Sequence, residues 1–318
     1  ATNNNYPQFA QLDKHRVCGV KLFMGSSTGN MLVDRMASLR NIFGGTDLLI
    51  AAHCEDQGII KENTDKYKKA YGDDVPLTLH PVIRSEEACY RSSELAVQLA
   101  REANARLHIM HISTARELDL FSDAPLITKR ITAEACVSHL LFTEDDYQTL
   151  GARIKCNPAI KTAEDRKALQ EAVNSGLIDA IATDHAPHLL SEKEGGALKA
   201  MSGMPMIQFS LASMLELVDK DIFSIEKIVE KMSHAPAQMY EINNRGFIHK
   251  GYQADLVLVR PNSKWTVTTD CIVSKCQWSP LEGHTFNWKV EKTFVNGHLL
   301  YDNGKIDETY RGQELRFR

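Results

Sequence analysis

The alternation of short apolar segments with longer amphipathic ones constrains the fold of this chain more than any other feature of its sequence. The strand-like segments are residues 17–24, 47–53, 105–111, 125–131 and 178–184. Between them, residues 85–103 and 162–176 carry apolar side chains at helical spacing; the first begins near Ser85, and the second runs from the N-cap candidate Thr162 to Gly176. Consecutive strands joined by helices are typical of an α/β fold with a parallel sheet.

The pattern changes after about residue 245, where short strands and turn signals replace the helices. Asn-Gly pairs at 296–297 and 303–304 are typical of tight turns between antiparallel strands. We therefore expect an α/β domain over residues 1–245 and a small β-sandwich module over residues 246–318.

The composition is that of a globular protein, and it excludes several function classes. Of the 318 residues, 43% are hydrophobic and 25% are charged, with a formal net charge of −4. No long basic run is present, so neither a nucleic acid nor an anionic membrane surface is an expected partner. No apolar stretch approaches the length of a membrane span. The seven cysteines form no CxxC pair and are typical of reduced thiols in a cytoplasmic protein.

Four of the strand-like segments end in a side chain that can bind a metal ion or carry a proton. These residues are Lys21, His53, His111 and Asp184, and each follows small or apolar residues at a spacing of two. The carboxyl ends of the strands form the catalytic face of a βα barrel. Taken singly, each of these residues has a more ordinary interpretation. A lone histidine is more often structural, Lys21 can be a strand end that reaches solvent, and Asp184 can be a helix cap. Four such strand ends together favour a site. The alternation puts His108 on the opposite face and indicates a structural role for it.

Four short motifs resemble those of a known family. They are GVKLFMGSS with Lys21, AAHCED with His53, LHIMHIST with His111 and ATDHAPH with Asp184. In this order they resemble the amidohydrolase superfamily and, within it, dihydroorotases of the long, bacterial-type class. The resemblance implies a TIM-like (β/α)8 barrel that carries a metal-dependent cyclic amide hydrolase. The implied reaction interconverts N-carbamoyl-L-aspartate and L-dihydroorotate in de novo pyrimidine biosynthesis.

The resemblance also implies roles for these four residues. In the family, the lysine that matches Lys21 is carboxylated and bridges two zinc ions, because an ammonium cannot be a ligand whereas a carbamate has two anionic oxygens. His53 and His111 match the ligands of one zinc ion. Asp184 matches the catalytic residue that binds the other zinc ion and carries a proton from the attacking hydroxide to the leaving nitrogen.

Five further residues match substrate or metal positions of the family. His188, the second histidine of ATDHAPH, matches the residue that binds the substrate carboxylate and carbonyl groups and distinguishes dihydroorotases from hydantoinases and allantoinases. Asn157 matches a contact to the pyrimidine ring, and Gly203 a loop glycine whose backbone meets the substrate. Glu134 and His139 match the ligands of a third zinc ion that some dihydroorotases carry. Each position also has a structural interpretation. His188 can be a loop histidine and Asn157 part of an Asn-Pro turn, while Glu134 can be a surface acid and His139 a histidine at a helix start.

One motif of the family is absent. Family members begin their barrel with an HxH motif that completes the second zinc site, and no HxH occurs in these 318 residues. Only 20 residues precede Lys21, and the sequence indicates five strands where a closed barrel needs eight. We therefore expect the chain to be the C-terminal portion of a longer protein and to be inactive alone, because the open edges of five strands leave backbone groups unpaired.

Two alternatives to a dihydroorotase remain open at the level of the sequence. The first is another cyclic amidase, a hydantoinase or an allantoinase. The second is a non-catalytic, dihydroorotase-like protein that binds a partner such as aspartate carbamoyltransferase. The missing HxH motif favours this second alternative, and the retained Lys21, His53, His111 and Asp184 oppose it. A homo-oligomer is compatible with each reading, since the sequence does not set the oligomeric state.

Overall fold

Five parallel strands form the central sheet of the computed structural model, which describes residues 1–25 and 30–318. The strands are β1 (Gly19–Phe23), β2 (Leu49–His53), β3 (Leu107–Ile109), β4 (Ile131–Cys136) and β5 (Ala180–Ala182). Each strand pairs with the next one along the chain, as in a βα barrel, and the expected α/β class with five strands is confirmed. Ser26 and Ser27, at the end of the GVKLFMGSS motif, lie outside the described residues.

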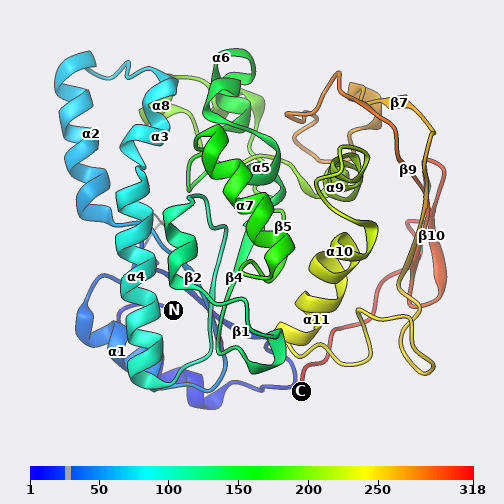
Figure 1. Ribbon diagram of the computed structural model, residues 1–318, viewed down its shortest axis with the longest axis horizontal. Coiled ribbons are helices and arrows are strands. Elements are labelled where there is room, and N and C mark those ends of the chain that lie inside the picture. The colour runs from blue at the N-terminus through cyan, green and yellow to red at the C-terminus, as the bar shows by residue number, and fades with distance from the viewer. Residues whose placement is uncertain (26–29) are drawn as a thin grey trace.

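Helices connect these strands, and Figure 1 shows α1, α2 and α4 side by side along one flank of the molecule. The α-helices are α1 (Met36–Gly44), α2 (Gln57–Tyr71), α3 (His80–Ile83), α4 (Glu86–Ala103), α5 (Val137–Leu141), α6 (Tyr147–Leu150), α7 (Ala163–Ser175), α8 (Gly196–Lys199), α9 (Ser210–Asp219), α10 (Ile225–Val229) and α11 (Ala235–Met239). The 3-10 helices are η1 (Tyr6–Gln11), η2 (Leu77–Leu79), η3 (Arg116–Leu120), η4 (Leu126–Thr128), η5 (Glu144–Asp146), η6 (Gly151–Ile154), η7 (Leu190–Lys193), η8 (Ile207–Phe209) and η10 (Thr269–Cys271). A π-helical turn, η9 (Glu230–His234), joins α10 to α11.

Capping residues set the ends of the two predicted helices. The hydroxyl of Ser85 accepts a hydrogen bond from the backbone N–H of Ala88 in the first turn of α4. Thr162 caps α7 in the same way, and Gly176 ends that helix with a φ of 93°. Such caps pair backbone groups that a helix end leaves without partners, and each contributes about 1 kcal/mol. Both predicted helices are confirmed.

The main core lies between one face of the sheet and the helices. Leu22, Ile50, Leu107 and Ile109 belong to a single buried cluster and are at most 1% exposed. Full burial of a side chain of this size contributes roughly 1.5–3 kcal/mol. Because the core occupies this face, the other face of each strand is left for the polar residues.

The fourth strand lies later in the chain than the apolar pattern indicates. Residues 125–131 hold the 3-10 helix η4, with Ile127 88% exposed, and β4 begins only at their end. Pro125 starts the turn, and its carbonyl accepts a hydrogen bond from the N–H of Thr128 at 2.9 Å. β4 itself is almost continuously buried, so it shows none of the alternation that identifies a half-buried strand. The expected strand at 125–131 was therefore wrong, and Glu134 lies within β4.

The C-terminal part of the chain is antiparallel. Its strands are β6 (Leu256–Arg260), β7 (Trp265–Thr266), β8 (Thr285–Phe286), β9 (Lys289–Val295), β10 (His298–Asp302) and β11 (Lys305–Ile306). Four of them form one sheet in the order β11-β10-β9-β6, and β7 pairs with β8. Asn296 and Gly297 have φ angles of 51° and 81°, which confirms the predicted hairpin turn. The division of the chain at residue 245 and the β-sandwich description remain predictions.

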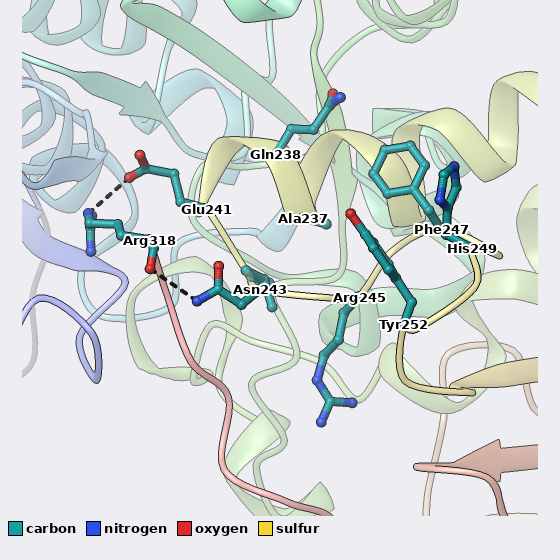
Figure 2. A pocket seen from close by; sticks show the side chains of 10 residues that line it. Ala237, Gln238, Glu241, Asn243, Arg245, Phe247, His249, Tyr252 and Arg318 are labelled. Atoms are coloured by element: carbon teal, nitrogen blue, oxygen red, sulfur yellow. Dashed lines mark hydrogen bonds and ion pairs between the residues drawn. The ribbon is translucent and has the colours of Figure 1, made fainter.

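The C-terminus returns to the amino-terminal edge of the parallel sheet. The guanidinium of Arg318 donates to the carbonyls of Lys14 and Val17, just before β1, and forms an ion pair with Glu241 at 3.0 Å. These contacts border a pocket of about 420 Å³ between the end of α11, the segment 243–252 and the C-terminus (Figure 2). The pocket lies away from the carboxyl ends of the strands. In the described parts of the chain, none of the helices has the length and apolar character that crossing a membrane requires.

Candidate active site

The carboxyl ends of the strands bring four predicted site residues to one edge of the sheet. Lys21 lies within β1, His53 ends β2, and His111 and Asp184 each follow a strand, β3 and β5, by two residues. The charges of Lys21 and Asp184 act on each other's pKa. The structure thus places the four residues in one region, at the edge that carries catalysis in βα barrels. The roles assigned to them remain predictions.

His53 and His111 are in direct contact in this region. Nδ1 of His53 lies 3.0 Å from Nε2 of His111, and both rings are buried. Burial lowers the pKa of His111 well below its ordinary value, and His53 and Lys21 lower it further, so the ring is neutral. Two nitrogens bound tetrahedrally to one zinc ion at about 2.0–2.1 Å lie roughly 3.3 Å apart. The pair therefore fits two ligands of a single metal ion.

The register of the strands corrects the predicted face of β3. Ala51 of β2 pairs with Lys21 on one side and with His108 on the other. Registered neighbours in a sheet point to the same face, so His108, and not Leu107, shares the face of Lys21. Sδ of Met110 accordingly lies 2.6 Å from Nζ of Lys21. The expectation that His108 faces away from the site was wrong.

His111 and Asp184 reach the site through backbone that is no longer extended. Their φ angles are 41° and 42°, in the left-handed region that residues other than glycine rarely adopt. β3 has already ended at Ile109 and β5 at Ala182, so the strand alternation no longer applies. The turn after each strand, and not the strand itself, aims these two side chains.

Lys21 holds its amine in apolar surroundings. Nζ lies against Sδ of Met110 and 4.7 Å from the centre of the Phe23 ring. Burial lowers the pKa of Lys21, although the negative charges of Asp184 and Glu134 oppose this shift. A lowered pKa increases the neutral fraction of the amine, which is the nucleophilic form. Lys21 thus has the chemistry that carbamate formation requires.

Asp184 lies at the rim and exposes part of its surface to solvent. Burial of the side that faces the protein raises the pKa of its carboxyl; the positive charges of Lys21 and His53 oppose this shift, and Glu134 reinforces it. A carboxylate with a raised pKa exchanges protons closer to neutral pH than an ordinary aspartate does. These properties suit a proton carrier.

Glu55 is a buried acid behind His53 that the sequence reasoning missed. Its side chain is fully buried, pairs with Arg84 and places Oε2 2.9 Å from Nε2 of His53, close but not aligned as a hydrogen bond. Burial alone would raise the pKa of Glu55, but Arg84 and His53 outweigh it and hold the pKa well below its ordinary value. The available signal was its position two residues after His53 in the AAHCED motif.

Glu134 and His139 are both buried but have different partners. Oε2 of Glu134 lies 2.9 Å from Nε2 of His108, and Nε2 of His139 lies 3.1 Å from the carbonyl oxygen of Pro158. The structure therefore does not pair Glu134 with His139, and the third zinc ion remains a prediction. Across residues 1–25 and 30–318, no group of three or more His, Cys, Asp or Glu side chains is arranged to hold a metal ion. Burial excludes the surface-acid alternative for Glu134.

The three predicted substrate-binding residues lie on loops that pack together. The backbone N–H of Gly203 donates to the carbonyl of Lys155 at 2.8 Å, two residues before Asn157. A Cβ atom at Gly203 would lie 3.1 Å from Cδ2 of His188. Oδ1 of Asn157 is buried, and among the described residues it has no hydrogen-bond partner. The N–H of Gly203 is occupied by its bond to Lys155, and its carbonyl accepts a hydrogen bond from Nζ of Lys193 at 2.7 Å.

His185 holds the loop that follows Gly203. Its Nδ1 accepts hydrogen bonds from the backbone N–H groups of Met206 and Ile207, each at 3.2 Å. Burial lowers the pKa of His185, which favours the neutral ring that can accept these bonds. Its role is therefore structural, although it is adjacent to Asp184.

Residues 34–300 match the amidohydrolase family, so the chain belongs to that family. It is 38% identical over 205 residues to a dihydroorotase of Clostridioides difficile, covering 64% of this chain and 48% of the relative. It is 30% identical over 257 residues to an allantoinase of Bacillus velezensis, covering 80% of this chain and 56% of the relative. The solved L-hydantoinase of Arthrobacter aurescens superposes with a TM-score of 0.90 at 25% identity, covering 96% of this chain and 69% of that one.

The chain spans about half the length of these two curated relatives. The superposition on the hydantoinase confirms the TIM-like barrel class expected from the sequence. Dihydroorotase, allantoinase and hydantoinase are all hydrolases of cyclic amides, so the matches agree on a class of chemistry while differing in substrate.

Proposed function

We propose that this chain carries metal-binding and substrate-binding residues of a zinc-dependent dihydroorotase, which interconverts N-carbamoyl-L-aspartate and L-dihydroorotate in pyrimidine biosynthesis. The observation that carries the proposal is the 3.0 Å approach of His53 to His111, with Lys21 and Asp184 at the same edge of the sheet. Similarity to dihydroorotases supports this substrate over other cyclic amides. The seven free cysteines support a cytoplasmic location.

His53, His111, Asp184 and a carboxylated Lys21 would hold the zinc ions. Bound zinc would supply a water of lowered pKa and polarise the amide carbonyl of the substrate. The carbamate forms when the neutral amine of Lys21 attacks CO2: a nitrogen–carbon bond is made, one C=O π bond of CO2 opens with its electron pair moving to oxygen, and the nitrogen releases one proton. The lowered pKa of Lys21 supports this step, because the protonated amine has no lone pair for the attack.

Asp184 would move the proton during ring opening. Its carboxylate accepts the proton of the attacking water and then donates it to the ring nitrogen as the carbon–nitrogen bond breaks. The raised pKa of Asp184 supports this role, since the protonated form must persist long enough to act as an acid. Ring closure would use the same group in the opposite order.

His188, Asn157 and Gly203 would hold the substrate beside this centre. The imidazole of His188 can donate a hydrogen bond to the carboxylate of dihydroorotate, a group that allantoin and simple hydantoins lack. The unpaired Oδ1 of Asn157 can accept from a ring N–H. The missing side chain at Gly203 keeps the space next to His188 open.

Substrate assays on the full product of the gene, loaded with zinc, test the proposal. We expect turnover of dihydroorotate and carbamoyl-aspartate to exceed that of allantoin and hydantoin. We expect His188→Ala to lower kcat/KM for dihydroorotate about 10–100-fold, the usual effect of losing a hydrogen bond to a charged group. Faster turnover of allantoin or hydantoin would overturn the substrate assignment. A folded protein that binds no zinc and turns over none of these would favour the non-catalytic partner of aspartate carbamoyltransferase.

A further inference from the structure

Lys193, the last residue of η7, directs its ammonium at the loop that carries Gly203. Nζ donates to the carbonyl oxygens of Met201 at 2.6 Å, Gly203 at 2.7 Å and Lys155 at 3.2 Å. A lysine ammonium has three N–H donors, so Lys193 uses all of them on backbone carbonyls. One side chain thereby joins the loop over residues 201–203 to the segment that leads into Asn157.

The surroundings of Lys193 show that this arrangement is not an ordinary ion pair. The residue is 6% exposed, and within the described chain its amine is paired with carbonyl oxygens and not with a carboxylate. Burial lowers the pKa of Lys193 to about 8. Nζ also lies 5.9 Å from the Trp278 ring, whose Nε1 donates to the carbonyl of His188 at 2.7 Å. The lysine is therefore connected to both Gly203 and His188.

We propose that Lys193 is a positioning residue for the substrate, which holds the Gly203 loop against His188 and thereby sets the affinity for dihydroorotate. This inference rests on the proposed function. Without the ammonium, buried carbonyls of the loop lose their donor, and the loop must move toward water to recover a partner. Little movement is needed to disturb the site, because the Gly203 and Ala186 backbones touch: a Cβ at Gly203 would lie 2.5 Å from the Ala186 carbonyl.

Lys129 provides a matched control. Its side chain is 3% exposed and donates to the carbonyl of Gly176 at 2.7 Å and to Asp179 at 2.8 Å. It precedes β4 and so lies at the opposite edge of the sheet from the candidate site. Loss of Lys129 therefore removes an equally buried amine without touching the Gly203 loop.

The test compares Lys193→Met, Lys193→Arg and Lys129→Met in the full gene product. Hydrogen exchange of the amides of residues 201–204 is measured without substrate, and KM and kcat are measured with dihydroorotate. For Lys193→Met we expect faster exchange in this loop and a KM raised about tenfold or more, with kcat within about threefold of wild type. Lys193→Arg keeps the cation, so its KM is expected to rise less. Lys129→Met is expected to lower thermal stability and to leave both the loop exchange and KM unchanged.

Wild-type loop exchange and KM in Lys193→Met would overturn the inference, and so would an equal rise of KM in Lys129→Met. If Lys193→Met does not fold, Lys193→Arg with wild-type KM and exchange would overturn it instead. A wild-type protein that does not turn over dihydroorotate would contradict the proposed function. In that case unchanged hydrogen exchange of the loop in the Lys193 variants would also overturn the positioning role. Faster exchange would show that Lys193 fixes the loop over residues 201–203.

Discussion

Oε2 of Glu55 approaches Nε2 of His53 to 2.9 Å, while Nδ1 of the same ring faces His111. The carboxylate thus lies behind the imidazole with respect to the candidate metal site. At 2.9 Å the negative charge of Glu55 favours the tautomer that carries its proton on Nε2, even without hydrogen-bond alignment, and this tautomer leaves a lone pair on Nδ1. Glu55 therefore acts on the site through His53, without belonging to the ligand set.

Glu55→Gln is expected to weaken zinc binding about 10–100-fold, because an amide orients and polarises the His53 ring less than a carboxylate does. Competition with a coloured chelator measures the change. Glu117→Gln is the control, since Glu117 is 2% exposed and hydrogen-bonded to Ser93 but does not contact His53. Equal zinc affinity of the Glu55 variant and the wild type would contradict this role.

Zinc uptake is expected to require CO2 or bicarbonate, because the unmodified amine of Lys21 is not a bridging ligand. Protein reconstituted with 13C-bicarbonate should show a carbamate carbon signal, and Lys21→Met should lack it. Lys129→Met, which removes a buried lysine elsewhere, should keep the signal. Full zinc occupancy after rigorous exclusion of CO2 and bicarbonate would argue against a carbamate at Lys21.

His139 is expected to make the metal-free protein less stable in mild acid. Burial lowers its pKa from an ordinary 6.5 to about 4, so between these values the unfolded chain holds a proton that the folded protein does not. Stability therefore falls as the pH falls through this window, by about 2 kcal/mol between pH 7 and 5 for one such group. Urea unfolding at both pH values should show a smaller loss in His139→Gln than in the wild type or in the exposed-site control His249→Gln. Parallel losses in all three proteins would refute this assignment.

Gly203→Ala is expected to destabilise the protein more than Gly251→Ala does. Both glycines have positive φ angles, 129° and 89°, so alanine brings backbone strain of about 1–3 kcal/mol at either site. Only at Gly203 would the new Cβ also meet the Ala186 carbonyl, whereas at Gly251 no atom of the described residues lies within 4 Å of it. Urea midpoints compare the two variants, and KM should rise only for Gly203→Ala. Equal destabilisation of the two variants would contradict this prediction, because it would mean that the Ala186 backbone moves aside for the new Cβ without cost.

The features that local sequence signals determine could be predicted. The caps at Ser85 and Thr162 define α4 and α7, and the Asn296–Gly297 pair defines a hairpin turn, because each depends on residues a few positions apart. Lys21 and His53 could be found because each is a polar residue in an otherwise apolar strand, Lys21 within β1 and His53 at the end of β2.

Features that depend on contacts between distant segments of the chain could not be predicted from the sequence. The face of His108 is set by its register with Ala51, which no local pattern encodes. Glu55 and Lys193 are buried charges whose partners come from elsewhere in the chain, so the sequence shows them only as polar residues on expected loops. β4 escaped prediction because it is buried on both faces and therefore carries no alternation.

The left-handed turns at His111 and Asp184 have a consequence for enzyme engineering. Each side chain is delivered by a short backbone unit, residues 110–112 and 183–185, whose shape is separate from that of the strand before it. Copying the histidine onto an extended continuation of a matching strand would give it the core face of Leu107 and Ile109, opposite Lys21. A transplant of this chemistry must therefore carry the turns as well, and a library built to alter the active site should hold these two units constant while varying the loops beyond them.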